Sequence, residues 1–179
     1  MPSIELRPYV LQDAPLLLDA ARESWREVHP WMAWCHSEIT IEETESWIRG
    51  QIPKFAARSE FDFTVRDERG AFLGSCGLNH IEPENRYCNL GYWLRTSRTR
   101  QGIMSLAVRR LSEWAFENTD LVRLEIVAAT GNIASQRVAE KAGAVREGTL
   151  RKRVQLHGVW HDAALFSITR DGVPTPSER

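Results

Sequence analysis

One stretch of this chain, residues 91–117, constrains the fold most because a strand, a glycine-containing loop and a helix follow one another without a break. The strand ends at Leu94, the polar loop covers residues 95–102, and apolar spacing predicts a helix over residues 104–117. A helix start presents unpaired backbone N–H groups and the positive end of the helix dipole. Gly102 carries no side chain that would keep a ligand from the backbone. These features suit a bound diphosphate, with three loop arginines adding charge; the alternative is a surface loop with solvated arginines. The arginines are Arg95, Arg98 and Arg100.

Strand and helix patterns fill the rest of the chain in a mixed order. Asp13 is expected to cap one helix, and Thr40 with Glu43 three residues later is a capping-box signature for another. The predicted strands cover residues 4–10, 61–67, 72–81, 89–94, 121–129, 145–157 and 160–169, and the predicted helices cover residues 14–28, 40–50, 104–117 and 132–142. This order predicts one α/β (α+β) domain over residues 1–170, with a central, mixed, mostly antiparallel twisted sheet and helices on both faces. A flexible tail is expected over residues 171–179.

Composition narrows the function classes. The formal net charge of −1 provides no general basic field, so no direct nucleic-acid binding is expected. No apolar run approaches the ~20 residues that cross a bilayer, and the N-terminus lacks the layout of a secretory signal, so no membrane association is expected. Three cysteines without C-x-x-C spacing are typical of reduced thiols in a cytoplasmic protein. They are Cys35, Cys76 and Cys88.

Other common ligand motifs do not fit the sequence. The chain has neither the G-x-x-x-x-G-K-S/T phosphate loop nor a G-x-G-x-x-G dinucleotide motif. His157 and His161 are four residues apart, but Gly158 stands where a zinc-protease motif needs glutamate, and the context predicts a hairpin rather than a helix. We therefore expect no metal site.

The second half of the chain carries a set of segments with a family resemblance. The loop and helix read GYWLRTSRTRQGIMSLAVRRL, and the following strand and helix read LEIVAATGNIASQRVAEKAGAVREG. Together with NHIEP, these segments resemble the acetyl-CoA-binding motifs of the GNAT superfamily of N-acetyltransferases. The set is most similar to the Rim-type branch, whose members acetylate N-terminal amines of ribosomal proteins. The resemblance covers roughly residues 4–169.

The resemblance implies a site for acetyl-CoA. The pantetheine arm would pair like an extra strand in a gap between two splayed strands, here residues 89–94 and 121–129. The backbone of Leu94 and the side chain of Asn132 would bind this arm, and residues 98–104 would wrap the diphosphate. The cofactor-binding residues that the resemblance implies are Leu94, Arg98, Thr99, Arg100, Gln101, Gly102, Ile103, Met104, Asn132 and Ser135.

Several positions depart from the family pattern. The loop pattern Q/R-x-x-G-x-G/A has Thr99 in its first slot and Arg100 in its first glycine slot. Ala139 stands where many relatives carry a tyrosine that protonates the leaving thiolate, and Asn89 stands where Rim-type relatives often carry a glutamate. Ser135 lies four residues before Ala139 on the same helix face, so we expect Ser135 to assist the departing thiolate; its alternative role is local capping or cofactor binding.

Four further side chains are candidates for the acceptor side. Trp31 and Trp34 correspond to a segment that walls the acceptor site in similar enzymes, and core packing is the alternative. His80 and Glu82 close a predicted strand and would pass a proton through water; ordinary surface residues are the alternative. A basic run would either be solvated or face an acidic protein substrate. The run consists of Arg146, Arg151, Lys152 and Arg153.

These observations favour an N-acetyltransferase that moves an acetyl group from acetyl-CoA to a primary amine. An α-amine loses its proton at a pKa near ~7.7–8.0 against ~10.4 for lysine, so its neutral form costs roughly 3.5 kcal/mol less, which favours a peptide or protein N-terminus. A ribosomal protein is one such partner, and the chain is a candidate homodimer. The alternatives are acetylation of a small amine or toxin and a CoA-binding protein without turnover.

Overall fold

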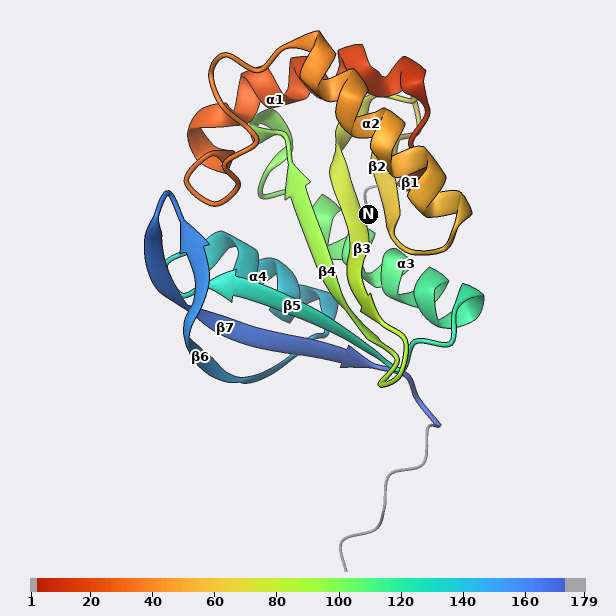
Figure 1. Cartoon of the computed structure of the whole chain (residues 1–179), viewed down its shortest axis with the longest axis vertical. Helices are drawn as coiled ribbons and strands as arrows, with labels where there is room; N and C mark the ends of the chain where they lie inside the picture. The colour runs from red at the N-terminus through yellow and green to blue at the C-terminus, as the bar shows by residue number, and fades with distance from the viewer. Residues whose placement is uncertain (1–2, 173–179) are drawn as a thin grey trace, which may run out of the picture.

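The structure, a computed structural model, describes residues 3–172 and contains a seven-stranded sheet (Figure 1). The strand order is β1-β2-β3-β4-β5-β7-β6. The strands are β1 (Ile4–Pro8), β2 (Phe61–Asp67), β3 (Phe72–Glu82), β4 (Tyr87–Leu94), β5 (Arg123–Ala129), β6 (Val145–Leu156) and β7 (Val159–Thr169), and the α-helices are α1 (Ala14–Val28), α2 (Ile41–Ala56), α3 (Ile103–Asn118) and α4 (Ile133–Ala142). All neighbouring pairs are antiparallel except β4 and β5, so the predicted mixed, mostly antiparallel sheet is confirmed.

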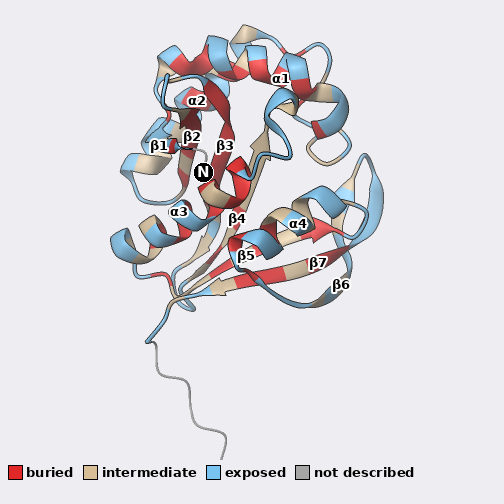
Figure 2. Cartoon of the chain, turned by 180° about the vertical axis from the view of Figure 1, so that it is seen from behind, coloured by how far each residue is buried: buried red, intermediate tan, exposed pale blue. Residues whose placement is uncertain are grey.

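The helices cover the two faces of the sheet. Helices α3 and α4 lie on the face that Figure 2 shows, where alternate residues of β2 such as Phe61, Phe63 and Val65 enter the main core with Leu111 of α3. Helices α1 and α2 cover the other face of β2, β3 and β4, where Tyr9 belongs to a smaller core. Side chains alternate between the faces of a strand, so the polar residues between these core positions face α1 and α2.

Strands β4 and β5 separate after a short parallel contact. Their pairs are Tyr87–Arg123, Cys88–Leu124 and Asn89–Glu125, and the strands diverge beyond that point. Strand β5 remains paired with β7 along its whole length, from Arg123–Thr169 to Ala129–Ala163. The expected gap between splayed strands is therefore present, and it opens toward the ends of β4 and β5 (Figure 1).

Helix α2 is longer than the sequence pattern predicted. The capping box at Thr40 is confirmed, because its side chain accepts from the Glu43 N–H and the Glu43 carboxylate accepts from the Thr40 N–H. The helix continues past residue 50, and past Pro53, to Ala56. Phe55 packs on Phe61 and Phe63 with ring centroids 5.3 Å apart in both pairs, so tertiary contact carries the last turn.

The expected capping role of Asp13 was wrong. No side-chain cap forms at α1, and Asp13 instead ends a 3-10 turn and accepts from the Val10 N–H at 3.0 Å. Its other oxygen pairs with Arg66 of β2, and the two side chains are 7% and 10% exposed. A buried guanidinium attracts the carboxylate more strongly than a helix end does, and Arg66 thereby fixes the start of α1 to the sheet.

The remaining predictions of element positions hold within a few residues, and α1 and α4 match well. The predicted tail falls almost wholly outside residues 3–172, which are the ones that the structure describes. None of the helices in the described residues combines the length and the apolar character that crossing a bilayer needs.

Removing one partner of the Asp13–Arg66 pair should be strongly destabilising. Asp13→Ala leaves a buried guanidinium unpaired, and we expect it to lower the free energy of unfolding by about 3–5 kcal/mol in urea denaturation. Glu5→Gln is the control, because the Glu5–Arg7 pair is exposed and its loss should leave the urea midpoint unchanged. A loss for Asp13→Ala no larger than that of the control would contradict the anchoring role.

Candidate active site

The loop before α3 has the shape of an anion-binding loop. Arg100 and Gly102 both adopt left-handed backbone, with φ of 62° and 75°. No side chain within residues 3–172 caps this end of α3, so its first N–H groups have no side-chain partner there. Arginine rarely adopts positive φ, yet Arg100 retains the conformation that a glycine in its slot would provide. Arg100 in this slot therefore adopts backbone that a glycine adopts readily.

The three loop arginines do not act together. Arg95 was expected to add charge near the phosphates, and this was wrong: its Nε donates to Glu23 at 2.8 Å and its Nη2 to Asp19 at 2.6 Å. These carboxylates belong to α1, so Arg95 ties the end of β4 to that helix. Arg98 and Arg100 are exposed beside the start of α3 and remain the charges of this site.

A hydroxyl pair connects β4 to the start of α4. The Tyr92 hydroxyl donates to the Ser135 carbonyl at 2.9 Å and lies 3.1 Å from Ser135 Oγ. Burial raises the pKa of Tyr92 to about 12, so this phenol stays protonated. Asn132 accepts from the Ser135 N–H at 3.1 Å and so caps the start of α4, and Ala139 is buried one turn further along. Ser135 therefore lies beside the gap with its hydroxyl oriented by Tyr92.

On the other face of the sheet, a cavity of about 350 Å³ lies between the strands and α1, α2 and their connection. Its walls are mostly aromatic and aliphatic, and its floor is polar. It is lined by Tyr9, Leu17, Met32, Trp34, His36, Ile39, Glu43, Thr44, Trp47, Asp62, Ser75, Cys76, Gly77, Asn79, Gly91, Tyr92 and Trp93. Tyr92 and Gly91 connect this cavity with the gap, so the two openings meet at β4.

The tryptophan-rich segment after α1 covers this junction. Trp34 lines the cavity and contacts Trp93 edge-on, with ring centroids 5.2 Å apart. Trp31 lies elsewhere: its ring is 3.5 Å from where a Cβ on Gly131 would stand, just before α4. The structure thus places Trp34 at the cavity and Trp31 over the loop between β5 and α4.

Asp62 is a residue that the sequence reading missed. It belongs to β2, lines the cavity floor, and has no hydrogen-bond donor among the described residues. Burial, with a smaller contribution from Glu60 and an opposing one from Lys54, raises the pKa of Asp62 to about 6. The sequence did contain a signal for Asp62, because this carboxylate stands between Phe61 and Phe63 in a predicted strand. Charged side chains are seldom buried without a partner, so a carboxylate inside a covered strand indicates a functional position.

His80 and Glu82 are not brought to the cavity. The Glu82 carboxylate accepts from the N–H groups of Glu84 and Asn85 and closes the β3–β4 turn. Glu82 pairs with Tyr87, at the closed end of the β4–β5 contact, and His80 is an exposed residue with φ of 50° at a strand irregularity. Neither side chain joins Ser135.

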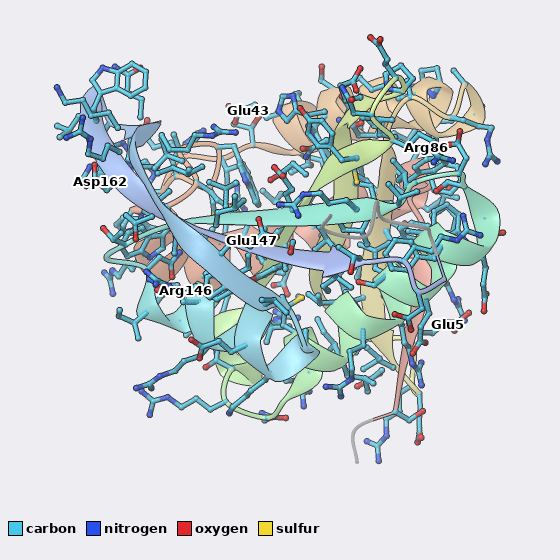
Figure 3. The ribbon with its side chains drawn as sticks, turned by 90° about the horizontal axis from the view of Figure 1, so that it is seen from below. Glu5, Glu43, Arg86, Arg146, Glu147 and Asp162 are labelled. Carbon is cyan, nitrogen blue, oxygen red and sulfur yellow. The ribbon has the colours of Figure 1, made fainter. Side chains whose placement is uncertain are left out.

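The β6–β7 hairpin carries the basic run and approaches α1. Arg146, Arg151, Lys152 and Arg153 are all exposed. Glu147 of β6 accepts from Arg123 of β5 and from Ser167 of β7 at 2.7 and 2.6 Å, and lies beside both strands in Figure 3. At the tip, His157 Nε2 donates to the His29 carbonyl at 2.9 Å, so the hairpin reaches the segment that follows α1. His157 thus makes a local contact between elements, and no group of metal-ligating side chains occurs among the described residues.

Comparison with known proteins adds an independent observation. Residues 3–145 match the family model of the GNAT acetyltransferase domain. YdaF of Bacillus subtilis (strain 168), which carries a provisional ribosomal N-acetyltransferase name, is 34% identical over 101 residues, 56% of this chain and 55% of YdaF, so the match spans about half of that protein. The ribosomal-protein-serine acetyltransferase of Escherichia coli (strain K12) is 28% identical over 137 residues, 76% of this chain and 74% of that protein. A solved structure described as RimL, a ribosomal L7/L12 alpha-N-protein acetyltransferase in complex with coenzyme A, has a TM-score of 0.86 and 25% identity, covering 94% of this chain and 95% of that chain.

The raised pKa of Asp62 predicts a stability cost. Because the folded value of about 6 exceeds the unfolded 3.8, the stability contribution of the neutral group is complete below 3.8 and is lost as pH rises to about 6. Asp62→Asn avoids this loss, so it should raise the free energy of unfolding by about 3 kcal/mol at pH 8 and only about 1 kcal/mol at pH 4.5, measured by urea denaturation. A difference that does not change with pH would show that the carboxyl titrates normally.

Proposed function

The chain belongs to the GNAT acetyltransferase family, and from this premise we propose that it transfers an acetyl group from acetyl-CoA to the N-terminal α-amine of a protein or peptide. The observation that carries the proposal is the meeting of two openings at β4. The gap between β4 and β5, with the loop before α3 (residues 95–102, the anion loop) at its side, suits a thioester donor. The cavity under α1 and α2 suits an acceptor.

The donor site fits acetyl-CoA by shape and charge. Beyond Asn89, β4 has no partner strand on its β5 side, so its backbone, including that of Leu94, is free to pair with the amides of a pantetheine arm. The loop and first turn of α3 offer N–H groups and two arginines to a diphosphate. We assign this role to residues 98–104, that is Arg98, Thr99, Arg100, Gln101, Gly102, Ile103 and Met104, with Asn132 beside the arm.

Ser135 is the group we assign to the leaving thiolate. Its hydroxyl stands at the start of α4 and is hydrogen-bonded to a Tyr92 phenol that stays protonated. When bound, acetyl-CoA supplies an activated thioester. Ser135 donates its hydroxyl proton toward the sulfur, and Tyr92 holds the hydroxyl in place by turning its own O–H from the Ser135 carbonyl to Ser135 Oγ.

The acceptor class follows from amine chemistry and from the relatives. An α-amine yields its neutral form for roughly 3.5 kcal/mol less than a lysine side chain does, which suits a cavity whose floor holds one partly buried carboxylate, Asp62. The E. coli relative is named for a ribosomal-protein serine and the RimL structure for the α-amine of L7/L12, which supports a protein N-terminus as the acceptor. A small amine entering the aromatic cavity is the second candidate.

The proposal predicts binding and turnover of acetyl-CoA. Acetyl-CoA should raise the melting temperature by mass action, and mixing it with a panel of peptides with free N-termini, N-blocked lysine peptides and small amines should release free thiol. We expect the free N-termini to react fastest. Binding without thiol release from any panel member would favour a CoA-binding protein, and fastest release with a small amine would favour the second candidate.

A separate prediction concerns Ser135. If its hydroxyl assists the departing thiolate, Ser135→Ala should lower kcat at least ~10²-fold and leave acetyl-CoA affinity nearly unchanged. Glu140→Gln, an exposed change on the same helix, is the control and should leave both constants unchanged. A loss of only a few-fold in kcat would assign Ser135 to capping or to cofactor binding.

A further inference from the structure

A row of three residues crosses the sheet between the cavity floor and the β4–β5 gap. Asp62 of β2 lies directly opposite Gly77 of β3, and Gly77 lies directly opposite Gly91 of β4. Residues directly opposite in antiparallel strands have side chains on the same face, here the face under α1 and α2. The two glycines leave that face bare between Asp62 and the gap.

The carboxylate of Asp62 leans along this row. A Cβ placed on Gly77 would be 2.2 Å from Asp62 Oδ1, so the carboxylate occupies the space above β3 rather than above its own strand. Neighbouring strands are about 4.8 Å apart, which leaves roughly one strand spacing between the carboxylate and Gly91. An amine nitrogen, or one water, fits that distance. A Cβ on Gly91 would meet only Asn89 and Asn79 amide nitrogens, at 3.8 and 4.0 Å.

Two polar groups of the cavity lack partners in the described residues. Asp62 accepts no hydrogen bond there, and the buried Tyr9 hydroxyl has none either. The Tyr9 hydroxyl is fully buried, and leaving such a group unpaired is costly, whereas Asp62 is partly buried and faces the cavity. Both line the same cavity, whose walls are largely apolar. This arrangement points to a ligand that brings hydrogen-bond donors to the polar end of the cavity.

The other polar groups that face the cavity either already have hydrogen-bond partners or are unsuited to accept a proton at neutral pH. Glu43 accepts from the Thr40 N–H at 2.7 Å and contacts His36 at 3.2 Å. Burial raises the pKa of the Cys76 thiol well above neutrality, and Tyr92 binds Ser135. Asn89, in the slot where relatives often carry a glutamate, donates to Asn79 at 2.8 Å and has no basic atom.

We propose that Asp62 is the proton acceptor for the acceptor amine, a role that rests on the acetyl transfer proposed above. Asp62 takes one proton from the ammonium group, directly or through one water, and releases it to solvent after turnover. The freed lone pair forms the N–C bond while the C–S bond breaks. The second amine proton reaches the sulfur through Ser135, so the products are the amide, the free thiol and one proton.

The surroundings of Asp62 also give its carboxyl a pKa that suits a proton acceptor. Its pKa of about 6 keeps it ionised at neutral pH and able to accept a proton from an α-amine. Glu60 raises this pKa and Lys54 lowers it, and these two residues pair with each other at 3.0 Å just outside the cavity. Removing the Glu60 charge should therefore lower the pKa of Asp62 without touching the site.

The test compares two acceptors in the wild type and in Asp62→Asn. One is a peptide with a free N-terminus, which is mostly protonated near pH 7, and the other is a peptide hydrazide, whose terminal nitrogen is neutral there. With saturating acetyl-CoA, Asp62→Asn should lower kcat for the peptide at least ~10²-fold and for the hydrazide only a few-fold. Acetyl-CoA binding, measured by calorimetry, should be unchanged. The limb of the wild-type kcat profile that titrates near pH 6 should be replaced in Asp62→Asn by a limb at the α-amine's own pKa of ~8, and it should be displaced to lower pH in Glu60→Gln, whose plateau rate should match the wild type.

The outcomes separate the two proposals. An unchanged kcat for the peptide in Asp62→Asn overturns the role of Asp62 and leaves acetyl transfer standing. An equal loss with peptide and hydrazide also overturns it, because a positioning defect does not depend on the proton of the acceptor. A wild type that turns over neither acceptor, nor any member of the amine panel, overturns the proposed acetyl transfer, and the role of Asp62 with it.

Discussion

The separation of β4 from β5 after three residue pairs is the constraint on which the rest of the site depends. Strand β5 is committed to β7 along its full length and β4 to β3, so neither strand bends back to close the gap. Tyr92 reaches from β4 to Ser135 of α4 and holds the two halves of the sheet at this spacing. Backbone groups left unpaired in a sheet interior are costly, and an amide-bearing ligand in the gap would satisfy them. The proposed donor site therefore follows from the strand pairing.

The proposed acceptor side would exchange stability for chemistry in a similar way. Gly77 and Gly91 carry no side chains under α1 and α2, and Asp62 keeps a carboxylate whose pKa is raised by burial. A Cβ at Gly77 would collide with the Asp62 carboxylate, so the glycine and the carboxylate depend on each other. Sites of this kind lower the stability of a fold, and they persist where the chemistry needs them. The buried Asp13–Arg66 pair, by contrast, joins the same strand to α1 and serves the fold alone.

Much of the fold followed from sequence patterns, and the missing parts share one physical reason. Local signals located α1, α4 and the loop before α3, because glycines and apolar spacing are properties of adjacent residues. The site was predicted less completely. The register of three strands places Asp62 at the cavity. Arg95 pairs instead with carboxylates that lie more than seventy residues earlier in the chain. Helix α2 extends beyond its predicted end because Phe55 packs against β2. Contacts between distant residues decided each of these, and spacing along the chain does not encode them.

Arg95 connects the two halves of the site. It lies between the end of β4 and the start of the anion loop, and its guanidinium holds Glu23 and Asp19 of α1. The Thr96 N–H donates to Ser24 and the Ser97 N–H to Glu23, so the same helix also fixes the first turn of the loop. Helix α1 borders the acceptor cavity through Leu17. The loop assigned to the diphosphate and the wall of the acceptor cavity are thus parts of one hydrogen-bonded unit. Both substrates would bind against it, and its rigidity would set the distance between them at β4.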